Sequence, residues 1–316
     1  MLLIQQKTMS VAEEKLADYI AYLQNVRGLS QNTIHKHFKL GLTFLKWLNR
    51  VGGFSYLPKL TPKDIENFIC RAGSKVGRAE LRHIVAFLRS YLNFLAARGE
   101  VPPELGNQID TPRVYREEQL PRCLDWEIVC ALLDSIDRST AIGKRDYAML
   151  LLIATYGLRA SEVVALKLDD IDWRHNCLRL SQRKTDTPLI LPLTAEVGNS
   201  IISYIKEGRP SVLYREFFVR HVAPSGILKP SAVSSIFRAL SERSCLPIPY
   251  RGAHCLRHSY ATYLLRQGIS LKTISDILGH RSLESTCIYL RLAVEDLRTV
   301  PLSLPVLSVP KKGGVS

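Results

Sequence analysis

The sequence predicts a mainly α-helical chain of two domains, of the α+β class, in which the second domain carries a small β-hairpin. Apolar residues recur every three to four positions from Ser10 to about Gly99, which is typical of amphipathic helices. Prolines between Val101 and Arg122 then interrupt the helical pattern. Beyond this break, helical patterns resume on both sides of one segment that resembles a pair of short strands.

Four helices are predicted before the proline-rich break. The first buries a stripe that starts at Leu16, and the second begins after Ser30, whose hydroxyl can cap a helix. The third begins at Thr61, which a proline follows at the first helical position, where proline is favoured. The fourth covers about residues 77–97. Together they predict an N-terminal four-helix domain over residues 1–103.

The chain carries a large excess of positive charge. Lys and Arg number 43 and Asp and Glu 29, a net charge of +14, which favours polyanionic partners such as nucleic acid or an anionic membrane surface. Through residue 103 there are 15 basic and 7 acidic side chains, a net of +8 (15 − 7). Arg78, Arg82 and Arg89 share one face of the fourth helix, because each residue turns the helix by ~100°. We expect this stripe to contact the phosphates of a nucleic acid rather than to serve only as a solvated face.

The composition also excludes several classes of protein. No apolar run approaches the ~18–20 residues that a membrane-spanning helix needs, and the start "MLLIQQKTMS" has too short an apolar run for a signal peptide. We therefore expect a cytoplasmic protein without a membrane partner. The seven cysteines are scattered without a C-x-x-C pair, which argues against a disulfide framework and against a zinc site.

The second part of the chain predicts a linker, a larger domain and a tail. The linker spans residues 104–122, the domain spans 123–300, and the Pro/Gly-rich tail spans 301–316. Within the domain, two strands at Cys177–Ser181 and Thr187–Leu191 flank a polar turn around Lys184. Further helices are predicted at Thr194–Lys206, Ser231–Arg243, His254–Gln267, Leu271–Leu278 and Leu283–Leu290.

Two arginines in this domain are candidates for binding an anion. In "HCLRH", His254 and Arg257 are three positions apart and project from the same face of one helical turn. A guanidinium in a groove is a natural phosphate ligand, although a solvated helix face explains the same pattern. Arg159 follows an apolar helix end and precedes Glu162, which can orient its side chain. The alternative for Arg159 is a purely structural ion pair with Glu162.

Three further side chains complete the set of candidates. Lys184 lies in the hairpin turn, from which an ammonium can reach a reacting oxygen, although turn lysines usually only aid solubility. His280 follows Gly279 at an apparent helix end, which leaves its imidazole exposed. Tyr289 comes nine residues after His280 (289 − 280) and is a candidate nucleophile. The alternative for Tyr289 is a packing role in the core or on the surface.

The order and spacing of these motifs resemble the tyrosine recombinases, the family of the phage integrases. The segment "TYGLRASEVVALKLDDID" resembles the first arginine box of that family, "HCLRHSYATYLLRQG" its H-x-x-R box, and "ILGHRSLESTCIYL" its histidine-to-tyrosine box. The resemblance covers about residues 125–297, and the N-terminal helices resemble the DNA-clamping domain of the family. It implies an integrase-type catalytic domain and a two-domain clamp around duplex DNA.

The resemblance also implies a role for each catalytic residue. Tyr289 attacks a DNA phosphate and forms a covalent 3′-phosphotyrosine, with His254 as the base and Lys184 as the acid that protonates the departing 5′ oxygen. The remaining cations neutralise the charge that develops on the phosphate. This chemistry needs no metal ion, ATP or other cofactor. The implied catalytic set is Arg159, Lys184, His254, Arg257, His280 and Tyr289.

The implied partners are double-stranded DNA with specific recombination sites and further copies of a recombinase. We expect a tetramer on two DNA sites, of this chain alone or mixed with related recombinases. The tail over residues 301–316 either docks onto a neighbouring copy or is disordered. Two other functions stay open, namely a type IB-like topoisomerase and a non-catalytic DNA-binding accessory protein. Integration, excision, resolution of replicons and transposition are not distinguished by the motifs.

Overall fold

The computed structural model describes residues 11–113, 121–182, 187–280 and 282–290 of the 316-residue chain. The chain divides into two compact units, Met1–Glu118 and Gln119–Ser316. Each unit has its own hydrophobic core. None of the helices in the described ranges is long and apolar enough to cross a membrane.

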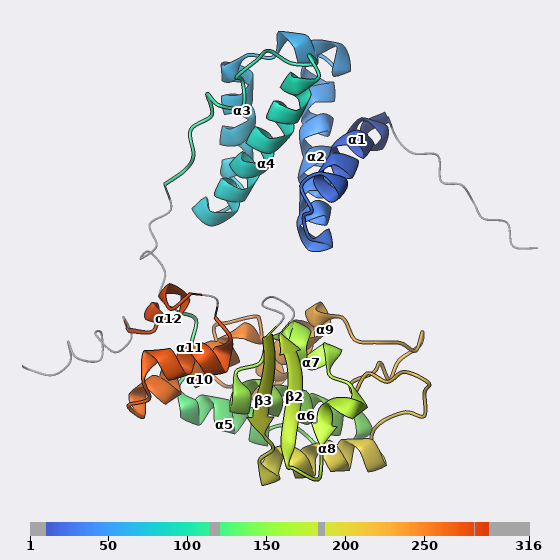
Figure 1. Ribbon diagram of the computed structural model, residues 1–316, viewed down its shortest axis with the longest axis vertical. Coiled ribbons are helices and arrows are strands. Elements are labelled where there is room, and N and C mark those ends of the chain that lie inside the picture. Colours follow the sequence, from blue (N-terminus) through green and yellow to red (C-terminus); the bar gives the residue numbers. More distant parts are fainter. Residues whose placement is uncertain (1–10, 114–120, 183–186, 281, 291–316) are drawn as a thin grey trace, which may run out of the picture. The chain divides into compact units, whose positions relative to one another are not determined.

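The first unit consists of four α-helices and one short 3₁₀ helix. Helix α1 packs on α2, and α3 packs on α4 (Figure 1). The four predicted helices are therefore confirmed. The bounds of all helices in this unit are α1 Val11–Asn25, α2 Gln31–Val51, η1 Phe54–Lys59, α3 Pro62–Gly73 and α4 Arg78–Ala97.

The helix starts in this unit follow from local side-chain chemistry. The Ser30 hydroxyl accepts a hydrogen bond from the backbone N–H of Thr33 and caps α2. Thr61 and Asp64 form a reciprocal capping box at the start of α3, where Pro62 occupies the first helical turn. These contacts satisfy N–H groups that have no partner within the helix.

The first unit continues beyond its fourth helix. The side chains of Val101, Leu105 and Ile109 are buried in its core. The Arg89 guanidinium of α4 donates a hydrogen bond to the carbonyl oxygen of Ile109, which ties the segment to the helix. Part of the predicted linker, residues 104–122, is therefore packed on the N-terminal unit.

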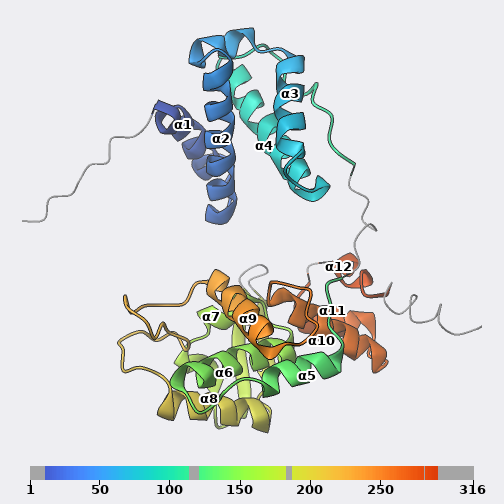
Figure 2. The same cartoon turned by 180° about the vertical axis from the view of Figure 1, so that it is seen from behind.

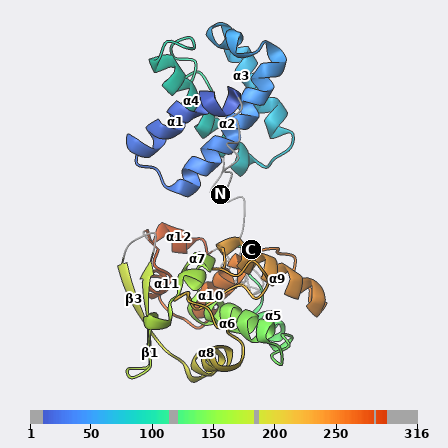
Figure 3. The same cartoon turned by 90° about the vertical axis from the view of Figure 1, so that its right-hand side faces the viewer.

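The second unit surrounds one buried helix. Most residues of α6 are buried, so this helix forms the centre of the core. The strands lie on one side of it, and α5 and α9 lie on the other (Figures 2 and 3). The helix bounds are α5 Trp126–Asp134, α6 Ala141–Tyr156, α7 Ala160–Ala165, η2 Leu168–Asp170, α8 Ala195–Glu207, α9 Pro230–Ser244, α10 His254–Arg266, α11 Leu271–Leu278 and α12 Glu284–Cys287.

Two details of this unit differ from the expectation. The predicted helix at Leu283–Leu290 is only the single turn α12. The predicted hairpin is confirmed but belongs to a three-stranded antiparallel sheet in the order β1 (Ile171–Asp172), β2 (Cys177–Gln182), β3 (Thr187–Pro192). Strand β1 has two residues, which is too short to produce an alternating pattern in the sequence. The hairpin tip with Lys184 lies outside the described residues.

Candidate active site

The second unit brings five of the six proposed catalytic residues into one cluster. Three segments build it: the junction of α6 and α7, the first turns of α10, and the stretch from the end of α11 to α12 and the tyrosine that follows. Helix α10 packs against both α6 and α11, which holds the segments together. Lys184 lies outside the residues that the structure describes. The clustered residues are Arg159, His254, Arg257, His280 and Tyr289.

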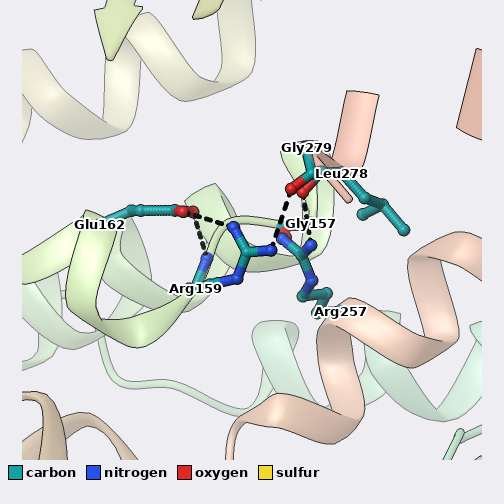
Figure 4. Close-up of polar contacts among 6 residues, drawn as sticks. All are labelled: Gly157, Arg159, Glu162, Arg257, Leu278 and Gly279. Carbon is teal, nitrogen blue, oxygen red and sulfur yellow. Dashed lines mark hydrogen bonds and ion pairs between the residues drawn. The ribbon is translucent and has the colours of Figure 1, made fainter. Parts of the chain in front are cut away.

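Arg159 is held in place by both its backbone and its side chain. It occupies the N-cap position of α7, where its backbone N–H donates to Glu162 Oε2 at 2.8 Å. Its Nη1 atom donates to Glu162 Oε1 at 2.7 Å, and Nη2 donates to the carbonyl oxygen of Gly279 at 3.2 Å (Figure 4). The ion pair expected from the sequence is thus present. The same guanidinium also reaches the end of α11, so it joins two parts of the cluster.

Arg257 lies at the centre of the cluster and is only 2% exposed. Its Nη1 atom donates to the carbonyl oxygen of Gly157, and Nη2 donates to that of Leu278, both at 2.5 Å (Figure 4). These carbonyls lie at the C-terminal ends of α6 and α11, where carbonyl groups lack partners within the helix and carry partial negative charge. The two helix ends therefore compensate much of the cost of burying the guanidinium.

Two glycines shape the helix ends that receive the arginines. Gly157 ends α6 with φ +63°, and Gly279 ends α11 with φ +58°, both in the left-handed region that favours glycine. A Cβ atom at Gly157 would lie 2.6 Å from the Leu278 Cδ2 atom. The chain can therefore bring α6 close to α11 at this point because no side chain intervenes.

The cluster carries a net positive charge. Burial, with the charge of Arg159 acting in the same direction and Glu162 in the opposite one, lowers the pKa of Arg257 to about 10. Arg257 is still protonated at neutral pH. Two guanidinium groups lie near one buried carboxylate, which pairs with Arg159, so the net charge is +1, and one phosphodiester can neutralise it.

His280 is positioned by a buried threonine. Its Nδ1 atom lies 2.8 Å from the hydroxyl oxygen of Thr286, which is fully buried in α12. Burial lowers the pKa of His280 to about 4, helped by the charges of Arg257 and Arg159. The imidazole is therefore neutral at pH 7. When Nδ1 accepts the threonine proton, Nε2 carries the ring proton and can donate to a phosphate oxygen.

Tyr289 is buried, with 1% of its surface exposed. Its hydroxyl oxygen lies 2.9 Å from the Nδ1 atom of His258. Burial raises the pKa of Tyr289 to about 12, although Arg257 and Arg159 act in the opposite direction. The phenol is therefore protonated, and its attack on a phosphate requires a proton acceptor.

The sequence motifs alone did not single out His258. They favoured His254 as the base, whereas the structure gives the tyrosine hydroxyl a hydrogen bond to the histidine four positions later. His254 is exposed at the start of α10, and its ring centroid lies 4.5 Å from that of His258. A signal for His258 is nevertheless present, since "HCLRH" places both histidines on one face of α10.

A surface cavity of about 380 Å³ opens beside the two histidines. It is large enough to admit a small molecule or part of a nucleotide, and His254 and His258 both line it. The other residues that line it are Pro121, Arg122, Tyr250, Gly252, Cys255 and Ile288.

The three N-terminal arginines that were expected to form one stripe are not equivalent. Arg78 and Arg82 are exposed on α4. Arg89 is half-buried, donates to the carbonyl oxygen of Ile109 and has a buried Nε atom without a hydrogen-bond partner among the described residues. Arg89 is therefore less accessible to solvent than Arg78 and Arg82, because the chain after α4 packs over it. Phosphate contacts by Arg78 and Arg82 stay a prediction.

The first unit has a second basic face that the sequence pattern did not predict. Four exposed side chains follow one face of α2 at spacings of three, seven and four residues. The last two of them also line a surface cavity of about 250 Å³ together with Trp47, Arg71 and Lys75. The four residues are Lys36, Lys39, Lys46 and Arg50.

Two family models match the chain. The model described as "Phage integrase family" matches residues 122–296, and the model described as "Phage integrase, N-terminal SAM-like domain" matches residues 16–99. The first match covers the whole cluster around α10, and the second covers most of the four N-terminal helices.

Curated relatives are similar over most of the chain. The "Putative integrase/recombinase y4rA" of Sinorhizobium fredii is 35% identical over 297 residues, which cover 94% of this chain and 72% of the relative. The "Tyrosine recombinase XerD" of Listeria monocytogenes is 31% identical over 290 residues, which cover 90% of this chain and 96% of the relative.

Solved structures share the fold. A post-cleavage complex of the XerH site-specific recombinase with palindromic difH substrate aligns with a TM-score of 0.68 and 19% identity, covering 91% of this chain and 85% of that one. A lambda integrase tetramer bound to a Holliday junction aligns with a TM-score of 0.64 and 18% identity, covering 86% of this chain and 76% of that one.

Proposed function

The chain belongs to the phage integrase family of tyrosine recombinases, and on this premise we propose that it cleaves and rejoins DNA at specific recombination sites through Tyr289. The observation that carries the assignment of residues is the cluster itself. Arg159 and Arg257 converge on the carbonyl groups of two helix ends, and the Tyr289 phenol lies buried among the same segments. A nucleophile beside a net positive charge is what phosphoryl transfer to a side chain requires.

Four residues of the cluster, together with Lys184, then have roles in one displacement step. The Tyr289 hydroxyl oxygen gives its proton to a histidine of α10 and forms a bond to the phosphorus, while the bond from phosphorus to the 5′ oxygen breaks. Arg159, Arg257 and His280 stabilise the charge that spreads over the non-bridging oxygens. Lys184 protonates the departing 5′ oxygen. The phosphotyrosine retains the energy of the broken bond, so the 5′-hydroxyl of a second strand can reverse the step without ATP.

We assign DNA binding to both units and propose a tetramer, made of this chain alone or with related recombinases, that acts on two duplexes. The net charge of +14 supports a polyanionic partner. The XerH complex and the lambda integrase tetramer with similar folds are bound to DNA. Because the relatives named above come from bacteria, whose DNA lies in the cytoplasm, we propose a cytoplasmic enzyme.

We assign the DNA contact of the N-terminal unit first to the basic face of α2. The four cations of this face are exposed and follow one side of a single helix, a geometry that suits a phosphate backbone. Arg71 in α3 and Lys75 in the turn after it extend the positive charge. Arg78 and Arg82 remain a second proposed contact.

A covalent-trapping assay tests the proposed function. The substrate is a duplex selected from a randomised pool for binding by the full chain, then nicked next to the cleavage point so that the freed fragment diffuses away. Wild type should form a protein–DNA adduct that survives denaturing electrophoresis. Tyr289→Phe should bind the same duplex and form none. An undiminished adduct in this variant contradicts the assignment of the nucleophile, and binding without an adduct in wild type favours an accessory protein.

A further inference from the structure

We propose that His258, rather than His254, accepts the proton of the Tyr289 hydroxyl when that oxygen attacks the DNA phosphate. The inference rests on the proposed function and adds a catalytic residue to it. Its basis is the 2.9 Å hydrogen bond between His258 Nδ1 and the Tyr289 hydroxyl oxygen. An acceptor must lie within about 2.6–3.2 Å of the atom whose proton it takes.

The position of His258 is fixed by its helix. It is the fifth residue of α10, directly after Arg257, whose guanidinium anchors the helix to the ends of α6 and α11. Tyr289 lies outside regular structure, two residues beyond the single turn α12. A rigid helix therefore presents the imidazole, and the less regular segment brings the phenol to it.

The protonation state of His258 suits an acceptor. Burial, and to a smaller extent electrostatic repulsion from His254, Arg257 and other basic side chains nearby, lower its pKa to about 4. The ring is neutral at pH 7, and the tautomer with its proton on Nε2 has a lone pair on Nδ1 that faces the phenol. His254 is the first residue of the helix and is exposed, which suits contact with an incoming phosphate.

The transfer is coupled to attack because it is unfavourable beforehand. In the DNA-free chain the phenol has a pKa of about 12 and the imidazole a pKa of about 4, so the proton stays on the tyrosine. A DNA phosphate bound beside Arg257 and Tyr289 adds a negative charge near His258, which raises the pKa of the imidazole. Bond formation to phosphorus lowers the pKa of the phenol oxygen at the same moment.

Every proton and every electron pair that moves in the proposed step has a donor and an acceptor. The oxygen–hydrogen bond of Tyr289 breaks and its proton moves to His258 Nδ1, while the tyrosine oxygen bonds to phosphorus. The electron pair of the bond between phosphorus and the 5′ oxygen leaves with that oxygen, which takes its proton from the general acid. In the reverse step, protonated His258 returns its proton to the tyrosine oxygen as the phosphotyrosine is attacked.

The test compares two substitutions of His258 in single-turnover cleavage of the selected, nicked duplex. His258→Asn keeps a hydrogen-bonding atom near the position of Nδ1 but cannot take a proton. His258→Ala removes the ring beside an open cavity that can admit free imidazole. Cleavage should fall by about 10²-fold or more in both variants, the range that general base catalysis typically supplies. DNA affinity and melting temperature should stay near wild type, as for the surface control His175→Asn.

Added imidazole separates proton transfer from positioning. It should restore cleavage by His258→Ala, and more basic methylimidazoles should restore it more, whereas His258→Asn should not respond. Wild-type cleavage by His258→Asn, or a slow His258→Ala variant that imidazole fails to rescue, overturns the proposal. If His258→Ala does not fold, the cleavage rate of His258→Asn alone decides. Absence of a Tyr289-dependent adduct in wild type overturns the proposed function instead.

Discussion

The Nη1 atom of Arg257 donates a hydrogen bond to the carbonyl oxygen of Gly157, although the two residues lie 100 positions apart in the chain. This contact joins the start of α10 to the end of α6. Because Gly157 lies two residues before Arg159, the contact also fixes the position of Arg257 relative to Arg159, the other arginine that the sequence motifs single out. Disturbing either the guanidinium or the glycine turn should therefore affect catalysis.

Removing either arginine should abolish most of the cleavage activity. Arg159→Ala and Arg257→Ala each delete donors to the charged transition state, and one such donor is typically worth about 10²–10³ in rate. Arg174→Ala, a substitution of an exposed arginine before β2, is the matched control and should cleave normally. Single-turnover adduct formation measures all three. Cleavage at the wild-type rate by Arg159→Ala would mean that the only role of this arginine is a structural ion pair with Glu162.

Gly157→Ala should lower the free energy of unfolding more than Gly268→Ala. Both glycines have positive φ, so alanine costs about 1–3 kcal/mol of backbone strain at either site. Only at Gly157 does the added methyl group also meet another side chain, at 2.6 Å from Leu278, whereas nothing lies within 4 Å at Gly268. Urea unfolding of the full chain measures the difference. Equal losses in the two variants contradict the close approach of α6 and α11.

Lys184→Ala should cleave normal DNA poorly and recover on a substrate with sulfur in place of the bridging 5′ oxygen. Sulfur departs without a proton, so a general acid becomes dispensable. Arg159→Ala on the same substrate is the control and should stay slow, because its role is charge stabilisation. If cleavage of this substrate recovers in Arg183→Ala and not in Lys184→Ala, the general acid is Arg183.

The stability of the second unit should fall as the pH drops from about 6.5 to about 4. His258 and His280 have an ordinary pKa of 6.5 when unfolded and about 4 when folded. In this window the unfolded chain binds more protons, so the free energy of unfolding decreases as the pH falls. Urea unfolding across the window should show a shallower decrease for His258→Asn than for wild type. Parallel curves for the two proteins contradict the lowered pKa of His258.

Neutralising the α2 face should weaken the salt dependence of DNA binding. Each lost phosphate contact reduces the slope of log K against log salt by about 0.9, so replacing Lys36, Lys39, Lys46 and Arg50 with Gln should reduce it by up to about 3.6. Sequence preference should change little, because phosphates carry no base identity. Arg78→Gln with Arg82→Gln is the comparison, with a reduction of up to about 1.8 if α4 also contacts DNA. An unchanged slope in the α2 variant would show that this face of α2 does not contact the DNA phosphates.

Much of the fold was predictable because its signals are local. Ser30, Thr61 and Asp64 cap helices through contacts within four residues, and apolar spacing marks the buried face of each helix. Strand β1 escaped prediction because two residues carry no period. The packing of Leu105 and Ile109 on the first unit also escaped, since prolines and polar residues around them are typical of a linker.

The sequence by itself determined which chemistry is available. The spacing of the arginine, histidine and tyrosine motifs is enough to indicate the family and the candidate residues around Arg159, Arg257 and Tyr289. The sequence also determined the excess of positive charge that DNA binding requires. These properties depend on residue identity and order alone.

Only the tertiary structure decided how those residues are used. His254 and His258 lie on the same helix face, so spacing cannot tell which of them meets Tyr289, a residue 31 positions beyond His258. Likewise, helical periodicity groups Arg89 with Arg78 and Arg82, but a segment 20 residues later covers Arg89 alone. Such pairings depend on how distant segments pack, and packing sets the burial and the hydrogen-bond partners that control reactivity.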